Sequence, residues 1–290
     1  MYLLGALPLA AEPVRVIDSA GREVVLEQPS QRIVALSPHI VENVFSAGAG
    51  DKLVGVVSYS NYPPAANDIP IVGGYHAFSL EKIASLRPDL VLCWAEGDGK
   101  EVAKPFEALG IPTYIDEPRQ LEEVATSVRN IGILSGTSDV ADAVADEFMQ
   151  RLSALQKQYS HQQAVSVFYQ VWNKPLQTIN NKHIISAVIE LCGGHNVFID
   201  TPVIAPKVSL EAVISRNPDV IIASGMDQAR PEWLDAWLDF PQLNAVVNHN
   251  LYFIPPDILQ RHTVRILQGA EKMCESLQQA REKRADGVNL

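Results

Sequence analysis

The sequence predicts an α/β protein made of two similar lobes with parallel, Rossmann-like sheets, joined by one long helix. Three observations predict it. The segment 80–92 returns in altered form at 210–222, one copy in each half of the chain. Short apolar runs without alternation recur along both halves, which is typical of strands buried on both faces of a parallel sheet. A long amphipathic stretch lies between the halves.

The two copies of the repeat have the same order of residues, and five of their thirteen positions are identical. Ser79 and Ser209 stand where a helix N-cap is expected, with Glu81 and Glu211 in the first turn, where a carboxylate suits the helix dipole. A Pro-Asp pair ends each helix, and an apolar run follows. A helix-Pro-Asp-strand unit in each half implies two related lobes.

Local patterns divide the first lobe into alternating strands and helices. Two alternating runs around a Ser-Ala-Gly turn favour a hairpin, and short apolar runs bounded by loop residues favour buried strands. The expected elements are a hairpin at 14–17 and 23–26, strands at 32–36, 53–57, 90–92 and 113–115, and helices at 39–47, 80–87 and 101–109.

One amphipathic helix at 121–134 and a second from 137 or 138 to about 159 interrupt this alternation. The second has apolar residues at steps of three or four from Val140 to Tyr159. Its length, about 30 Å, suits a helix that joins the lobes. We therefore expect a first lobe at 12–136, a linking helix at 137–160 and a second lobe at 161–290.

The second lobe repeats the α/β alternation. A β-branched run opens it, and Gly193-Gly194 is expected to cap its first helix. The expected elements are strands at 165–171, 220–223 and 251–254, and helices at 184–192, 210–217, 233–240 and 263–281. Of the cysteines, Cys93 ends a buried strand and is expected to be a free thiol. Cys192 and Cys274 lie on helices of this lobe, and their spacing leaves it open whether they pair.

Composition excludes some classes of function. The formal net charge is −11, which argues against a nucleic-acid or anionic-membrane surface. No apolar run reaches the 18–20 residues or so of a membrane span. Residues 1–11 resemble the apolar core and small-residue end of a secretory signal, although they lack its basic region. No cysteine stands near its end, so we expect a soluble exported protein rather than a lipid-anchored one.

Motifs of catalysis are missing, whereas aromatic residues follow the expected strands. The sequence has no G-x-S-x-G, H-E-x-x-H, C-x-x-C, P-loop or G-x-G-x-x-G. Tyr59, Trp94 and Trp172 each follow a strand, and Tyr75 precedes the first repeat helix. Ligands of open α/β sheets bind at the carboxyl ends of the strands. The pattern favours a flat, largely apolar ligand in a cleft between the lobes.

These features together resemble the class III periplasmic binding proteins of ABC importers, in which two α/β lobes are joined by one helix. The branch that binds iron-siderophores, haem and cobalamin is the most similar, and its cobalamin binders most of all. The segments that carry the resemblance are 16–22, 32–38, 54–64, 90–94, 191–198 and 257–261. The resemblance covers about residues 14–280 and implies a monomer in the periplasm that binds a corrinoid and no catalytic cofactor.

The resemblance also implies roles for individual residues. Tyr59 and Trp94 match aromatic residues that pack on the corrin, and Tyr75 stands where a Trp is expected. Asp257 and Arg261 match polar contacts to the ligand. The resemblance further implies that Cys192 and Cys274 form a disulfide, and that Glu81 and Glu211 dock into arginine pockets on the transmembrane subunits of the importer. The sequence departs from the pattern at Ile204-Ala205-Pro206, where a second-lobe Trp is expected.

Other ligands remain open. The Gly74-Tyr75-His76 loop also resembles the loop by which haem carriers ligate iron, so Tyr75 or His76 would be a metal ligand if the ligand were haem. A nearby cation would then lower the pKa of the tyrosine, and Arg261 or Arg265 could supply it. A ferric siderophore is expected to meet several basic residues, of which few can be named. A tetrapyrrole metal chelatase is the alternative of another class.

Overall fold

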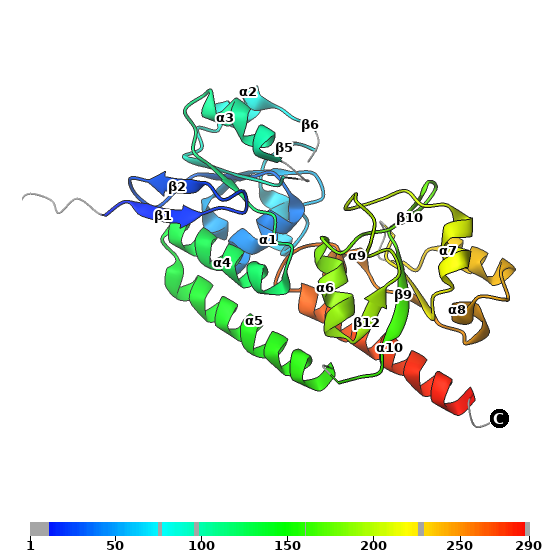
Figure 1. The fold of residues 1–290 in the computed structure, drawn as a ribbon. Helices are drawn as coiled ribbons and strands as arrows, with labels where there is room; N and C mark the ends of the chain where they lie inside the picture. Colours follow the sequence, from blue (N-terminus) through cyan, green and yellow to red (C-terminus); the bar gives the residue numbers. More distant parts are fainter. Residues whose placement is uncertain (1–11, 75–76, 96–98, 160, 226–228, 288–290) are drawn as a thin grey trace, which may run out of the picture. The chain divides into compact units, whose positions relative to one another are not determined.

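The computed structural model describes residues 12–74, 77–95, 99–159, 161–225 and 229–287 (Figure 1). The chain divides into two compact units. Unit 1 consists of the described residues up to Glu117 together with Val128–Asp142. Unit 2 consists of Pro118–Ser127 and the described residues from Ala143 onwards.

Unit 1 contains a hairpin and a largely parallel sheet. Its strands are β1 (Val14–Ile17), β2 (Glu23–Leu26), β3 (Ile33–Ala35), β4 (Leu53–Val57), β5 (Ile71–Gly74), β6 (Ala77–Phe78), β7 (Leu90–Cys93) and β8 (Thr113–Ile115). Its helices are α1 (Pro38–Ser46), α2 (Leu80–Ser85) and α3 (Lys104–Glu107), with 3₁₀ turns η1 (Gly50–Lys52), η2 (Pro64–Asp68) and η3 (Gly99–Ala103). The β1–β2 hairpin has the predicted bounds, with Gly21 in its turn at a φ of 73°.

The six-stranded sheet of unit 1 has the order β6-β5-β4-β3-β7-β8. Its strands are parallel except for the β5–β6 pair. β3 and β7 are entirely buried, as their unbroken apolar runs predict. The predicted helix at 101–109 is wrong in its first half, which is the 3₁₀ turn η3. Pro105 in the first turn of α3 offers a reason, because it has no N–H to donate to the preceding turn.

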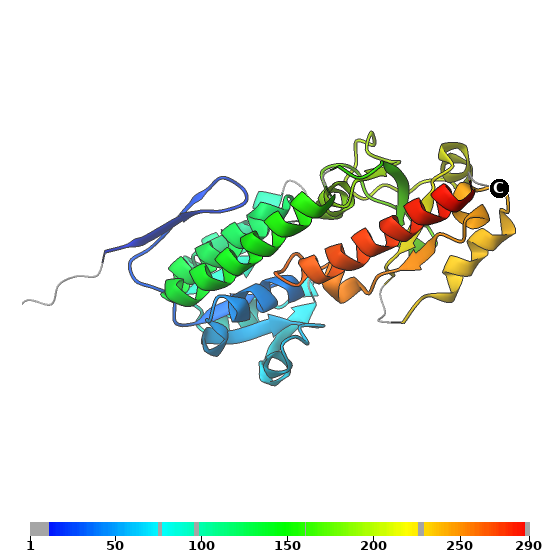
Figure 2. The ribbon, with the colours of Figure 1, turned by 90° about the horizontal axis from the view of Figure 1, so that it is seen from below.

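Helices α4 (Leu121–Ser135) and α5 (Ser138–Tyr159) run side by side in both views (Figures 1 and 2). The predicted bounds of α5 are confirmed, but its buried face begins at Ala141 and not at Val140, which is 49% exposed. The reason is the close approach of α4 at Gly132, where an added Cβ would lie 2.3 Å from the Ala141 Cβ. The helices approach closely because Gly132 and Ala141 are small, and a valine at position 141 would hold them further apart.

Unit 2 has a fully parallel sheet with the order β12-β9-β13-β14. The strands of the unit are β9 (Val165–Gln170), β10 (Trp172–Asn173), β11 (Leu176–Gln177), β12 (Gly194–Asn196), β13 (Val220–Ala223) and β14 (Leu251–Phe253). Of these, β10 and β11 form a separate antiparallel hairpin. The helices of the unit are α6 (Ile184–Leu191), α7 (Leu210–Arg216), α8 (Asn244–Val247), α9 (Pro256–Leu259) and α10 (Ile266–Gly287), with the 3₁₀ segment η4 (Glu232–Asp239).

A disulfide joins α6 to α10 in unit 2. Cys192 at the end of α6 is bonded to Cys274 in α10, across 82 positions of sequence. Both residues lie in a buried cluster with Met273 and Leu277, and Figure 2 shows α10 running along this unit. Gly193 follows as the expected left-handed residue with a φ of 69°, but Gly194 is the first residue of β12 and not part of the cap.

The repeat has the same local structure in both units. The hydroxyls of Ser79 and Ser209 accept hydrogen bonds from backbone N–H groups in the first turns of α2 and α7, at 3.1 Å in each case, which confirms the predicted N-caps. The residue before each proline, Arg87 or Asn217, has a left-handed backbone, with φ of 49° and 42°. The chain therefore reaches each proline through the same backbone conformation, although α2 ends one residue further from its proline than α7 does.

The aspartate of each repeat fastens its strand to the neighbouring one. Asp89, before β7, accepts backbone N–H bonds from Gln31 and Arg32 at the start of β3. Asp219, before β13, accepts from the Ser166 N–H in β9 at 3.1 Å and from its hydroxyl at 2.8 Å. These carboxylates satisfy backbone donors at the amino end of each central strand pair. The carboxyl ends of these strands lie at the opposite edge of each sheet, which is where ligands of open α/β sheets bind.

Candidate ligand-binding site

Each sheet has a topological switch point at its centre. In unit 1 the chain passes outward from β3 to β4 and β5, then returns to build β7 and β8 on the other side. In unit 2 it passes from β9 to β12 and then returns to build β13 and β14. The loops after two neighbouring strands diverge at such a point, which leaves a crevice at their carboxyl ends. In this protein the two switch points lie between β3 and β7 and between β9 and β13.

Trp94 lies at the switch point of unit 1. It follows β7 directly, and its ring meets that of His39 edge to face at 5.6 Å between centroids. His39 comes from the start of α1, after β3, and its Nδ1 shares a hydrogen bond of 2.7 Å with the Ser37 hydroxyl. His39 is buried, whereas Trp94 keeps part of its surface exposed. The contact holds the indole at the carboxyl end of β7.

Tyr59 lies at the same edge, after β4. Its backbone is left-handed, with a φ of 67°, an uncommon conformation for a residue with a large side chain. The preceding Ser58 N–H donates to the Gly73 carbonyl of β5 and fixes the start of the turn. Tyr59 is 78% exposed. An exposed aromatic ring in a constrained turn, next to a crevice, is a feature of ligand-binding loops.

Two of the predicted residues, Tyr75 and His76, lie outside the described part of the chain.

Trp172 lies at the switch point of unit 2, in the small hairpin β10–β11 that extends from β9. Its indole Nε1 donates to the Lys174 carbonyl at 3.1 Å, which orients the ring. The Trp172 side chain is partly exposed and meets the ring of Trp233 at 6.4 Å between centroids. The sequence patterns did not single out Trp233, which comes from η4.

Asp257 and Arg261 follow β14, the neighbour of β13. They form an ion pair of 3.0 Å, with 27% and 13% of their side chains exposed. Gln260 between them donates to the Gly225 carbonyl at 3.1 Å and so holds this turn against the end of β13. A partly buried charge pair supplies fixed polar groups for a ligand with polar substituents.

Glu81 and Glu211 lie elsewhere, on exposed first turns of α2 and α7. A hydrogen bond from its own backbone N–H, and one from the Ser209 hydroxyl, lower the pKa of the Glu211 carboxyl. Charge on this residue therefore persists to lower pH than on an ordinary glutamate.

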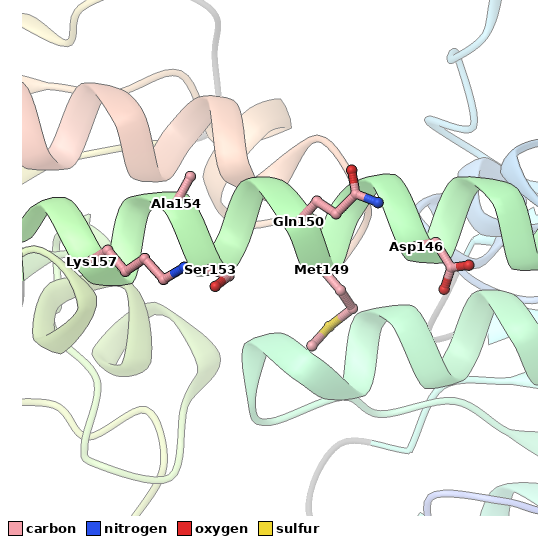
Figure 3. A pocket seen from close by; sticks show the side chains of 6 residues that line it. All are labelled: Asp146, Met149, Gln150, Ser153, Ala154 and Lys157. Atoms are coloured by element: carbon pink, nitrogen blue, oxygen red, sulfur yellow. The ribbon is translucent and has the colours of Figure 1, made fainter.

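One groove among the described residues lies along a helix and not at a strand end. It is a groove of about 530 Å³ along α5. The residues that line it all belong to this helix: Asp146, Met149, Gln150, Ser153, Ala154 and Lys157. Figure 3 shows that their side chains are spread along the helix and do not converge on one point. Without aromatic rings or convergent polar groups, this groove is a weaker candidate than the strand ends.

Within the described residues, no group of three or more His, Cys, Asp or Glu side chains could hold a metal ion. Among the same residues, no helix is both long enough and apolar enough to cross a membrane.

The stability of unit 2 is expected to depend on the protonation of His183. It caps α6 by accepting the Ile185 N–H at 3.2 Å, and its ring meets that of His262 at 5.6 Å. Although the residue as a whole is only partly buried, protein atoms surround the imidazole, and this lost solvation lowers its pKa to about 4. A cap that must accept a hydrogen bond is most stable when neutral.

We expect the free energy of unfolding to fall as the pH decreases from about 6.5, where an unfolded histidine gains its proton, towards 4. The loss due to His183 is at most about 3 kcal/mol. Replacing His183 with Asn keeps a cap acceptor and removes the titration. Urea unfolding at pH 7.5 and pH 4.5 should show a smaller difference for His183→Asn than for the wild type. Equal differences would contradict this role.

An α/β protein with two parallel-sheet units and aromatic, partly exposed switch points has the architecture of a small-molecule binding protein. Residues 33–258 match the family model described as periplasmic binding protein, and the chain belongs to this family.

Comparison with known proteins is consistent with this assignment. The chain is 36% identical to the vitamin B12-binding protein of Vibrio cholerae over 255 residues, which cover 88% of this chain and 92% of that protein. It is 32% identical to that of Yersinia pseudotuberculosis over 277 residues, 96% of each chain. The crystal structure of the periplasmic vitamin B12-binding protein of Vibrio cholerae matches with a TM-score of 0.79, covering 87% of this chain and 98% of that one. The predicted class III fold is confirmed.

A periplasmic heme-binding protein from Roseiflexus also matches, with a TM-score of 0.73 at 23% identity, covering 87% of this chain and 99% of that one. At this identity the match shows the fold alone.

Proposed function

We propose that this chain is a periplasmic substrate-binding protein that captures cobalamin or a related corrinoid and delivers it to an ABC importer. The observation that carries the proposal is the pair of aromatic switch points, Trp94 in unit 1 and Trp172 in unit 2. It is supported by 36% identity to a vitamin B12-binding protein over nearly the whole chain. A flat macrocycle with an apolar face suits such aromatic surfaces.

Each proposed ligand residue has a separate role. The rings of Tyr59, Trp94 and Trp172 pack on apolar faces of the corrinoid, because their partly exposed surfaces lose contact with water on binding. Tyr75 is proposed as a fourth aromatic contact. Asp257 and Arg261 bind the amide side chains of the ligand, the carboxylate as acceptor and the guanidinium as donor. The chain performs no chemistry on its ligand in this proposal.

A periplasmic carrier also needs a surface for the importer. We propose Glu81 and Glu211 for this role, in contact with arginine residues of the transmembrane subunits. Both are exposed, both stand two residues after an N-cap serine, and each lies in its own unit. Equivalent carboxylates suit a partner that offers equivalent cationic pockets, and charge-assisted hydrogen bonds fix the register of docking.

Isothermal titration tests the ligand. Cyanocobalamin is expected to bind with one site per chain, and hemin weakly or not at all. Trp94→Ala should weaken cyanocobalamin binding at least about tenfold, since a buried aromatic contact is removed. Leu109→Ala is a matched control, because Leu109 is 53% exposed on unit 1, away from the strand ends. Strong heat with hemin and none with cyanocobalamin would overturn the proposal.

A further inference from the structure

Trp233 and Trp172 meet at the carboxyl ends of two adjacent strands. Trp172 follows β9, Trp233 lies in η4 after β13, and β9 and β13 are paired in parallel register. Their rings contact edge to face, at 66° and 6.4 Å between centroids. This is the switch point of unit 2, and it corresponds to the His39–Trp94 contact between β3 and β7 in unit 1. Each sheet thus carries one aromatic pair where its strand order reverses.

The segment that carries Trp233 is anchored. Leu234 and Trp237, on the same 3₁₀ segment, are buried in a core cluster with Phe168 of β9. The Trp237 indole donates to the Gln170 Oε1 at 2.7 Å. The Gln170 Nε2 donates in turn to the Trp172 carbonyl at 3.5 Å. One buried glutamine at the end of β9 therefore links the segment of Trp233 to the backbone of Trp172.

Trp233 itself packs against the edge of this cluster and, unlike Leu234 and Trp237, is not fully buried in it. Trp237 is 4% exposed, whereas Trp233 is only partly buried, and its remaining ring contact is with Trp172. Gly225, at the end of β13, has a φ of 71°, and a Cβ there would lie 3.6 Å from the Trp233 ring. The strand end thus passes close beneath the indole without a side chain in between.

The neighbourhood of Trp172 explains why a ring from η4 is useful. On the side of β11, the Gln177 amide donates to the Ala205 carbonyl at 3.1 Å, so the small Ala205 borders the hairpin where an aromatic residue was expected. Trp172 itself contacts Trp233. The aromatic surface of unit 2 is therefore built from the segments that follow β9 and β13 and not from the segment before α7.

We propose that Trp233 is a further ligand-contacting residue that forms, with Trp172, the aromatic wall of unit 2 and packs on a flat, apolar face of the tetrapyrrole. This inference rests on the proposed function and extends it to a residue with no role in that proposal. A preformed pair costs little conformational entropy on binding, because both rings are already oriented by Lys174, Gln170 and the core.

Titration of cyanocobalamin into Trp233→Ala tests the inference. We expect its affinity to fall about tenfold, as for the loss of one aromatic contact. Trp233→Phe, which keeps a flat ring, should lose about threefold or less. Leu238→Ala is the matched control, because Leu238 lies on the same segment and is 53% exposed. This variant should bind cyanocobalamin with the affinity of the wild type.

The outcomes separate this inference from the proposed function. If the wild type does not bind cyanocobalamin, the proposed function fails. If the wild type binds and Trp233→Ala binds equally well, the pair only packs the rim of the core, and the inference fails. Should Trp233→Ala not fold, Trp233→Leu keeps an apolar side chain of similar reach without a flat ring. Wild-type affinity in that variant would overturn the inference, and a loss near tenfold would support it.

Discussion

Replacing both Glu81 and Glu211 with alanine is expected to abolish stable docking to the importer and to leave ligand affinity within about twofold of the wild type. Both residues are exposed on the first turns of α2 and α7, and neither belongs to the segments after β4, β7 and β9 that carry the aromatic residues. Removing two charge-assisted contacts weakens an interface, and the partners are then no longer fixed in one orientation. We expect uptake of labelled cobalamin, measured with the importer in proteoliposomes, to fall at least about tenfold.

A double variant with the same change in net charge is the control. Glu27 and Glu275 are exposed, one in each unit, and lie outside the repeats. Glu27→Ala plus Glu275→Ala should transport ligand at the wild-type rate. If Glu81→Ala plus Glu211→Ala also supports normal uptake, the two glutamates only stabilise the starts of their helices.

Removing the disulfide is expected to have the largest effect on stability. The bond between Cys192 and Cys274 closes a loop across 82 positions. In the chain-entropy model such a cross-link is worth about 4 kcal/mol, because it restricts the unfolded chain. That is a large part of the free energy of unfolding of a typical protein, which is about 5–15 kcal/mol. Urea unfolding of Cys192→Ala plus Cys274→Ala should show this decrease relative to the oxidised wild type.

The third cysteine provides a check on the pairing. Cys93 is a free and fully buried thiol, and loss of solvation raises its pKa to about 12. A thiol reagent should therefore find no reactive group in the native protein and one group after unfolding without reductant. Three thiols after unfolding would show that the bond is absent.

The sequence could predict much of the fold because the repeat is local. Ser79 and Ser209 act within one helical turn, and the apolar runs of β7 and β13 are continuous, so pattern alone identifies them. The same holds for the helix Ser138–Tyr159, whose apolar spacing extends over many turns.

Features that depend on distant parts of the chain escaped prediction. β12 is three residues long and forms only by pairing with β9, and the segment 233–240 is a 3₁₀ and not an α-helix. Trp233 has no motif of its own. Its place beside Trp172 follows from the order of the strands, which no local pattern encodes. The available signal is a tryptophan in the segment that follows a buried strand, although Trp233 stands further from its strand than Tyr59, Trp94 and Trp172 do from theirs.

The absorption spectrum of the protein recovered from bacterial cells grown with cobalamin tests the central claim most directly. The native chain, purified without unfolding from an extract of the periplasm, should carry the absorption bands of a corrin in about equal molar amount to protein. Trp94→Ala, prepared in parallel, should carry less. A Soret band of haem, or no bound chromophore in a folded protein, would contradict the account.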